Sequence, residues 1–366
     1  MITLRNVSKQ FPGSRTPAVA AFSLEVAEGE TVILVGPSGS GKTTILRMIN
    51  RLIEPTGGTI EVDGVDVMSI EAVELRRRIG YVIQSIGLLP HRTVAQNIGT
   101  VCRLIGWDKE RTAQRVTELA AMLELDAELL ARYPSELSGG QRQRVGVARA
   151  LGVDPPVLLM DEPFGAVDPI VRGRLQEQLL HLQSQIRKTI VLVTHDIDEA
   201  MRLGDRIAII NTGGALEQYA APEEILRAPA TTFVADFIGA ERGLKRLALA
   251  QVKSIEADPG PVVHPDDPVA KAIQAMAAGG LDWAVVVDEN GHLKGWVDQH
   301  ALEGHEKVGE AQARPFSAAV APSSSLREAL DAIVTSRTHV AAVVDEGRYC
   351  GILTLEQVST GVSDPA

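Results

Sequence analysis

The sequence predicts an α/β domain with a mostly parallel sheet, followed by a smaller domain built from two copies of one β-α-β-β unit. At about 150 residues per domain, a chain of 366 residues allows two to three domains. Up to about residue 240, helical patterns alternate with short apolar runs, which lie at 31–35, 157–160, 190–194 and 207–210. Short apolar strands between helices are typical of a parallel sheet that is covered on both faces.

Residues 88–156 lack such runs and predict a helical insert in the first domain. Apolar residues recur with helical spacing from Asp108 to Leu125. Ser138 is a suitable N-cap for a second helix that extends to Leu151. The first domain is therefore expected to span residues 1–240 and to contain this insert.

An internal repeat follows a junction near Glu241–Arg246. Residues 265–289 align without a gap at an offset of 57 (341 − 284), and Gly295 and Gly351 match one residue closer. Each copy predicts a helix (269–278; 326–336), a buried strand (283–287; 340–344) and a second strand (293–297; 349–353). The copies, at 244–305 and 309–366, are expected to pack face to face because neither buries its sheet alone.

Composition excludes several classes of protein. The balance of 36 basic and 47 acidic side chains gives a net charge of −11, which argues against a nucleic-acid partner. Cys102 and Cys350 lie far apart, without disulfide or metal spacing, so a reducing cytosol is expected. The start lacks a signal-peptide pattern, and the longest apolar stretches fall far short of the ~20 residues that span a bilayer. A membrane role would therefore need another chain.

A phosphate-binding loop is predicted between strand 31–35 and a helix running from Thr43 to about Ile53. Its backbone N–H groups would converge on phosphate oxygens, Lys42 would reach the β- and γ-phosphates, and Thr43 would offer a hydroxyl to Mg²⁺. The alternative, an ordinary glycine-rich turn, fits this strand–helix setting less well. The predicted nucleotide-binding residues are Gly36, Pro37, Ser38, Gly39, Ser40, Gly41, Lys42, Thr43 and Thr44.

Two adjacent carboxylates follow the apolar strand 157–160. Ligands of open parallel sheets bind at this end of the strands. Asp161 is expected to hold Mg²⁺ through water, and Glu162 is the candidate base for the attacking water. The pair could merely start a loop, but together with the phosphate loop it favours a catalytic role.

Leu137-Ser-Gly-Gly-Gln141 begins a helix 20 residues (161 − 141) before Asp161 and resembles the signature sequence of ATP-binding cassette (ABC) ATPases. Backbone donors at this helix start predict a second anion site, formed by Ser138, Gly139, Gly140 and Gln141. The resemblance implies a head-to-tail dimer, in which each ATP lies between the phosphate loop of one chain and the signature helix of the other. It also implies a mostly parallel sheet, an antiparallel β subdomain and a helical subdomain.

The ABC resemblance covers residues 1–240 and implies further roles. Phe11 would stack on adenine, unless it is a core residue on an edge strand. Gln84 would link the γ-phosphate and Mg²⁺ to the helical insert. Asp168 closes a loop that departs from the usual Ser-Ala-Leu-Asp at Gly165 and Val167. His195 matches the switch histidine that contacts the γ-phosphate, although a histidine at a strand end is often structural.

The stretches 132–151 and 160–169 resemble the sequences of prokaryotic importers of glycine betaine, carnitine, choline and proline. The resemblance implies a cytosolic ATPase subunit at the inner face of the membrane, docked on permease chains, with a substrate-binding protein outside. Segment 85–90 would then lie in the groove for a permease coupling helix, or Leu88 and Leu89 would simply pack in the core. An importer for another solute, such as an amino acid, and a nucleotide-sensing regulator are the alternatives.

The repeated units resemble a pair of CBS domains, a tail that betaine-type ATPases carry. Such pairs often bind adenine nucleotides through a Ser or Thr followed three residues later by Asp. This sequence has Thr354 with Gln357, and Asp298 with Ala301, so AMP or ATP binding is not expected. Cyclic-di-AMP binding at a tail dimer, a response to ionic strength and a purely structural tail stay open.

Overall fold

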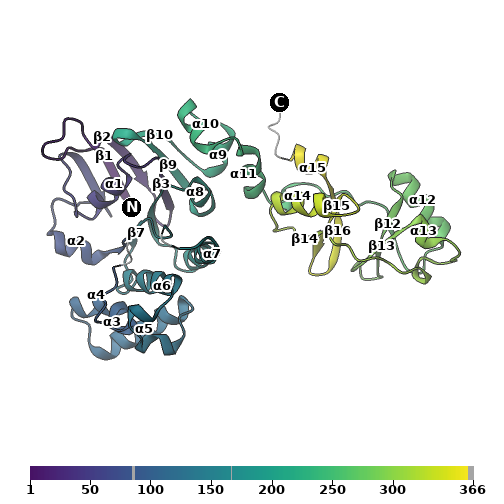
Figure 1. Cartoon of the computed structure of the whole chain (residues 1–366), viewed down its shortest axis with the longest axis horizontal. Coiled ribbons are helices and arrows are strands. Elements are labelled where there is room, and N and C mark those ends of the chain that lie inside the picture. Colours follow the sequence, from purple (N-terminus) through teal and green to yellow (C-terminus); the bar gives the residue numbers. More distant parts are fainter. Residues whose placement is uncertain (85–86, 166, 362–366) are drawn as a thin grey trace. The chain divides into compact units, whose positions relative to one another are not determined.

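The computed structural model describes residues 1–84, 87–165 and 167–361. The chain forms two compact units, Met1–Gly239 and Ala240–Ala366, whose elements Figure 1 labels. Parts of three predicted features lie outside the described residues: Ser85 and Ile86 of the coupling segment, Ala166 of the loop that ends at Asp168, and 362–366 of the second copy. Within the described ranges, no helix is both long and apolar enough to cross a bilayer.

A six-stranded sheet in the order β10-β9-β3-β8-β7-β6 forms the centre of the first unit. All neighbours pair in parallel except β10, which is antiparallel to β9. β3, β7 and β8 are buried along their whole length, as strands covered by helices must be. The four predicted strands are confirmed. The strands are β3 (Thr31–Val35), β6 (Ile79–Val82), β7 (Val157–Asp161), β8 (Thr189–Thr194), β9 (Arg206–Asn211) and β10 (Ala215–Ala220).

A four-stranded antiparallel sheet in the order β2-β1-β4-β5 confirms the expected second β layer. One apolar core joins the two sheets through the first helix. Phe22 and Ile60 belong to the antiparallel sheet, Leu46 to the helix and Val193 to the six-stranded sheet. Burying this core fixes the helix that follows the phosphate loop. The strands are β1 (Ile2–Lys9), β2 (Val19–Val26), β4 (Gly57–Val62) and β5 (Val65–Asp66).

The helix after the phosphate loop ends earlier than predicted, at Ile49 instead of about Ile53. Arg51 adopts a left-handed φ of +52°, and the N–H groups of Leu52 and Ile53 both donate to the Arg47 carbonyl. The helices of this part are α1 (Lys42–Ile49), α2 (Ala72–Arg78), α7 (Pro169–Ile186), α8 (Ile197–Leu203), α9 (Pro222–Arg227) and α10 (Thr232–Ile238).

Between β6 and β7 the chain is helical, and both predicted helices are confirmed. Asp108 caps α5 by accepting from the Arg111 N–H, and Ser138 caps α6 by accepting from the Gln141 N–H. These helices gather at one end of the unit in Figure 1. They are α3 (Val94–Ile98), α4 (Thr100–Leu104), α5 (Lys109–Met122) and α6 (Gly139–Ala150).

The second unit begins with α11 (Arg242–Leu249) and contains two three-stranded sheets, β11-β12-β13 and β14-β15-β16. In each sheet the first pair is parallel and the second antiparallel, so the two copies share one topology. The first copy comprises β11 (Val262–Val263), α12 (Val269–Gly279), β12 (Trp283–Val287), β13 (Leu293–Asp298) and α13 (Gln299–Leu302). The second comprises β14 (Ala319–Val320), α14 (Leu326–Thr335), β15 (Val340–Asp345), β16 (Arg348–Thr354) and α15 (Leu355–Thr360).

An apolar seam joins the two copies and confirms their predicted face-to-face packing. Trp283, Val285 and Trp296 of the first sheet form one buried cluster with Val340 and Ile352 of the second. The two tryptophan rings meet edge to face, with centroids 6.5 Å apart. Each copy thus closes the sheet of the other.

The matched glycines of the repeat have a structural cause. Gly295 has a φ of +145°, and a Cβ there would lie 2.3 Å from the Arg314 carbonyl oxygen. Gly351 has a φ of +142°, and its Cβ would lie 2.8 Å from the Asp258 carbonyl oxygen. In both copies another segment crosses the strand at this point, so only glycine fits.

Candidate functional site

The predicted phosphate loop connects β3 to α1, and its glycines occupy positions that other residues cannot. A Cβ on Gly36 would lie 2.0 Å from the Ile210 carbonyl oxygen. Gly41 is the N-cap of α1 with a φ of +96°, and a Cβ there would lie 2.7 Å from the Ala18 carbonyl oxygen. The loop is therefore held against β9 and the residue before β2 by close backbone contact, which leaves no room for a side chain at Gly36 or Gly41.

Lys42 is buried and folds back over the loop. Its Nζ donates to the carbonyl oxygens of Gly36 and Pro37, both at 2.8 Å, and approaches Ser40 Oγ at 3.3 Å. Burial lowers the pKa of Lys42, while the nearby Glu162 and Asp161 carboxylates oppose this shift. The ammonium thus lies inside the loop, where an anionic oxygen would be its natural partner.

Asp161, at the end of β7, is buried, and its carboxylate contacts the Thr43 hydroxyl, the other predicted metal ligand. Its carboxylate accepts from Thr43 Oγ1 at 2.9 Å, Arg47 Nη2 at 3.3 Å and Tyr81 OH at 3.4 Å. Burial and the Asp161 charge raise the pKa of Tyr81, which keeps the phenol a donor.

The donor set around Asp161 suits Mg²⁺, which proteins usually hold through one or two carboxylates together with substrate phosphates and water. The Thr43 hydroxyl and the Asp161 carboxylate lie next to each other at the end of the phosphate loop. Among the residues that the structure describes, no group of three His, Cys, Asp or Glu side chains forms a complete protein cage. This pair fits a metal that keeps other ligands.

Glu162 is the meeting point of the three predicted catalytic residues. Gln84 Nε2 donates to Glu162 Oε2 at 2.9 Å, and His195 Nδ1 lies 3.5 Å from the same oxygen. The residues follow β6, β7 and β8, so the carboxyl ends of three adjacent parallel strands bring them together. Gln84, also predicted as a metal ligand, bonds here with Glu162, and its metal role stays a prediction.

The backbone of Glu162 is strained. Its φ is +45°, a left-handed conformation that costs a non-glycine residue roughly 1–2 kcal/mol. The Glu162 N–H donates to the Val193 carbonyl oxygen at 3.0 Å, which holds the residue against β8. Strain of this kind is often found at functional sites. Here it turns the Glu162 side chain towards Gln84 and His195.

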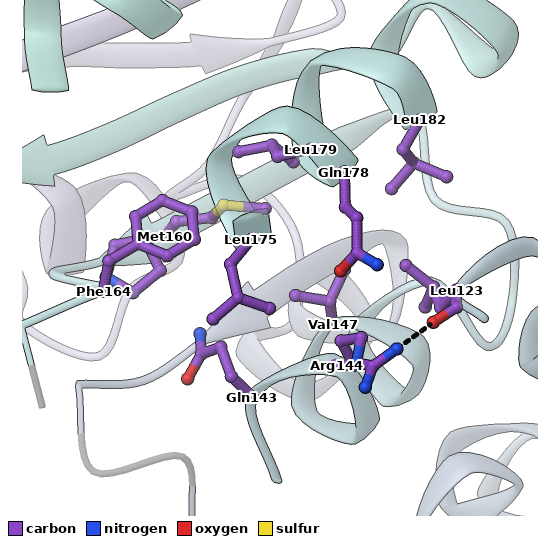
Figure 2. A pocket seen from close by; sticks show the side chains of 11 residues that line it. Leu123, Gln143, Arg144, Val147, Met160, Phe164, Leu175, Gln178, Leu179 and Leu182 are labelled. Carbon is purple, nitrogen blue, oxygen red and sulfur yellow. Dashed lines mark hydrogen bonds between the residues drawn. The ribbon is translucent and has the colours of Figure 1, made fainter. Parts of the chain in front are cut away.

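Apolar side chains pack next to the Asp161–Glu162 pair. Met160 and Phe164, on either side of the Asp161–Glu162 pair, are buried and line a narrow cavity with Leu175 of α7 and Val147 of α6. Figure 2 shows these side chains together, with Arg144 reaching the Leu123 carbonyl oxygen at the cavity edge. No phosphate-loop residue lines the cavity, so its contribution to the site is support.

The signature residues cap their own helix. Ser138 Oγ accepts from the Gln141 N–H, and Gln141 Oε1 accepts from the Ser138 N–H at 2.8 Å. A Cβ on Gly140 would lie 2.7 Å from Val171 Cγ1 of α7, so this position is tight. α6 packs against α3, α5, α7 and β6, whereas α1 packs against β4, β7 and β8. The two predicted anion-binding helix ends therefore belong to different parts of the unit.

The structure places the other predicted residues as follows. Phe11 is 40% exposed beyond β1, with Lys9 Nζ 5.3 Å from its ring centroid, so the core alternative is wrong. Asp168 caps α7 by accepting from the Val171 N–H at 3.1 Å. Ser38 and Gly39 are exposed on the phosphate loop, Ser40 is buried in it, and Thr44 lies in α1.

Sequence reasoning missed two partners of Asp161. Arg47 lies four residues after Thr43 in α1, a spacing that places both on one helix face and could have been noticed. Tyr81 lies on β6, which pairs with β7, and that neighbour relation has no local signal. Thr194 and Glu199, on either side of His195 in the sequence, form a hydrogen bond with each other that no sequence pattern predicts.

Comparison with known proteins agrees with this geometry. The profile of the ABC transporter family matches residues 19–165, and the CBS domain profile matches residues 252–302 and 312–363. The osmoprotectant import ATP-binding protein OsmV of Salmonella typhimurium is 45% identical over 99% of this chain and 96% of its own length. The chain belongs to the ATP-binding subunits of osmoprotectant ABC importers. The family and CBS resemblances are therefore confirmed.

Other members of the osmoprotectant family and solved cassettes are also similar. The glycine betaine/carnitine/choline transport ATP-binding protein OpuCA of Bacillus subtilis is 45% identical over 97% of this chain and 94% of its own length. A dimeric cassette in a post-hydrolysis state, bound to ADP and phosphate, is 34% identical with a TM-score of 0.55. It covers 61% of this chain and 99% of its own. Such ABC subunits bind nucleotide, dimerise and work with membrane permeases.

Proposed function

We propose that this subunit hydrolyses ATP to drive the import of glycine betaine, carnitine, choline or proline through a partner permease. The observation that carries the proposal is the meeting of Gln84, Glu162 and His195 beside the phosphate loop. Relatives that match almost the whole chain are named for osmoprotectant, glycine betaine, carnitine and choline transport. The subunit would sit at the cytoplasmic face of the membrane, with a substrate-binding protein delivering the solute.

The chemistry follows from the geometry of the cluster. Loop N–H groups and Lys42 hold the β- and γ-phosphates. Thr43 and Asp161 are the residues that would hold Mg²⁺, which would neutralise phosphate charge. The Glu162 carboxylate accepts a proton from the attacking water. Gln84 orients that carboxylate by donating to Oε2, and His195 faces the same oxygen from β8.

A second copy completes the nucleotide site in this proposal. The first N–H groups of a helix have no partner within it, so those of Gly139 and Gly140 are available to a phosphate of the neighbouring copy. Ser138 and Gln141 shape this helix end through their mutual cap. The Phe11 ring, which is 40% exposed, would stack on adenine.

For the tail, the contacts at the predicted ligand positions favour a structural role over binding of an adenosine ribose. Thr354 and Gln357 are joined in a reciprocal helix cap, and Asp298 caps α13 by accepting from the Ala301 N–H. Cyclic-di-AMP remains the ligand to test. A thermal shift of the full chain in cyclic-di-AMP would support a sensing tail, and no shift would support a structural one.

Transport is tested by co-purifying the subunit with its permease and measuring ATP-dependent uptake of glycine betaine, choline and carnitine into vesicles at several ionic strengths. Uptake of at least one solute is expected. Uptake of none, with phosphate release intact, would refute the osmoprotectant assignment and favour another solute such as an amino acid. Absence of phosphate release would favour the nucleotide-sensing alternative.

A further inference from the structure

A buried acid lies directly behind the turn that carries His195. Glu199, in α8, is 6% exposed, and its Oε2 accepts from Thr194 Oγ1 at 2.8 Å. Its other oxygen, Oε1, is buried without a hydrogen-bond partner among the described residues. A buried carboxyl with an oxygen that lacks a hydrogen-bond partner is costly, so its presence at this place calls for a reason.

The Thr194 hydroxyl ties together both sides of His195. It donates to Glu199 and accepts from the Asp196 N–H at 3.1 Å. Since Thr194 precedes His195 and Asp196 follows it, one hydroxyl fixes the backbone on each side of the histidine. The Glu199 carboxyl in turn fixes the direction of that hydroxyl, because it gives the hydroxyl hydrogen an acceptor.

A cation from another helix secures the same turn. Arg172 of α7 lies 3.6 Å from Asp196 Oδ2 through Nη1 and donates through Nη2 to the Val167 carbonyl oxygen at 3.3 Å. Val167 belongs to the loop that ends at Asp168. The Asp196 carboxylate also accepts from the Glu199 N–H at 3.2 Å, which closes the network back on α8.

We propose that Glu199 is a positioning residue, which holds the Thr194–Asp196 turn so that His195 faces Glu162. The inference rests on the hydrolytic role proposed above for His195. Thr194 and Glu199 are buried, whereas the His195 side chain is 61% exposed. An exposed imidazole has no packing of its own to fix it, so its direction depends on the turn beneath it.

The electrostatic surroundings of Glu199 fit this role. Burial raises the pKa of Glu199 to about 7. The titratable groups that face it are Asp196 and His195 from the turn before α8 and Arg172 from α7, while β3 and β8 carry no titratable side chain. A neutral acid and a carboxylate both accept from the Thr194 hydroxyl, so the contact persists on either side of neutral pH.

The first test compares Thr194→Val with Thr194→Ser in the full chain, by steady-state phosphate release. Thr194→Val removes the hydroxyl at constant shape, and we expect kcat to fall about tenfold with the KM for ATP within about twofold of wild type. Thr194→Ser keeps the hydroxyl and should stay within about twofold in both. Equal rates for the two variants would overturn the proposal.

The second test is a double-mutant cycle between Glu199→Ala and His195→Ala, read as single-turnover hydrolysis. Glu199→Ala should slow hydrolysis about tenfold alone and add nothing beyond about twofold in the His195→Ala background. The same tenfold loss in both backgrounds would refute positioning through His195. Normal hydrolysis by His195→Ala would instead refute the role proposed for the histidine. If Glu199→Ala does not fold, the Thr194 pair decides.

Discussion

Replacing Glu162 with Gln separates the proton-accepting role of this carboxylate from its shape. The amide has the same size, so it can still accept from Gln84, which lies 2.9 Å from Oε2 in the native chain. The left-handed φ of +45° is no easier for Gln than for Glu. The substitution therefore removes the negative charge and the basicity while the local geometry stays.

The expected fall in kcat is the contribution of general-base catalysis, because the substitution removes the charge and the basicity while the shape stays. General-base catalysis contributes about 10²–10⁴ in rate, which corresponds to roughly 3–5 kcal/mol in the activation free energy. The contact with His195 is worth under about 1 kcal/mol of stability, because the histidine is 61% exposed. Glu162→Gln should thus lower kcat 100- to 10,000-fold with nearly unchanged melting temperature and ATP affinity.

The assay is phosphate release, combined with sedimentation of the full chain in ATP and Mg²⁺. Because the variant binds ATP without consuming it, dimers should accumulate, whereas wild type should return to monomers as ATP is hydrolysed. Glu177→Gln is the matched control: this acid of α7 is 67% exposed and pairs with Arg202, and its loss should leave kcat unchanged. A Glu162→Gln rate within tenfold of wild type would refute the assignment of the base.

Three further outcomes are expected. Gly36→Ala puts a methyl group 2.0 Å from the Ile210 carbonyl oxygen, so we expect ATP binding to be lost in calorimetry and the unfolding free energy to fall by about 1–3 kcal/mol. Trp283→Ala opens the seam between the repeated copies and should cost the second unit about 3–5 kcal/mol in denaturant unfolding, with phosphate release retained. Glu199 binds its proton more tightly in the folded chain, so its contribution to stability is complete below about pH 4.5 and is lost as pH rises towards 7. The free energy of unfolding should therefore fall more between pH 5 and pH 8 in wild type than in Glu199→Gln, by up to roughly 3 kcal/mol. The melting temperature should fall more in wild type as well.

Each of these expectations has a contrary result. Tight ATP binding by Gly36→Ala would mean that the loop can move away from β9. Equal unfolding free energies for Trp283→Ala and wild type would mean that the two sheets are stable separately. Parallel pH profiles for Glu199→Gln and wild type would mean that this acid is charged in the folded chain at pH 5.

The features that sequence analysis predicted well are those that depend on a short run of consecutive residues. The phosphate loop, the carboxylate pair after β7 and the Ser138 cap each carry a local pattern that ties a residue type to a backbone requirement. The repeat predicted that the two copies pack together, because matched positions such as Gly295 and Gly351 recur at a fixed spacing.

The features that it missed depend on which strands become neighbours. The strand order places β6, β7 and β8 side by side, and only then do Tyr81, Asp161 and Thr194 reach one edge of the sheet. The bond from Gln84 to Glu162 depends on that order as well. The early end of α1 had no signal, since Arg51 takes up a left-handed conformation that its residue type does not favour.

The seam between the two repeated copies also has a consequence for synthesis of the chain. Trp283 leaves the ribosome 57 residues before Val340 and 69 before Ile352, the residues that cover it. At roughly 5–20 residues per second, the first sheet waits on the order of ten seconds with its apolar face open. During that interval the nascent tail is a target for chaperones. A chain truncated after the first copy would leave that apolar face open permanently.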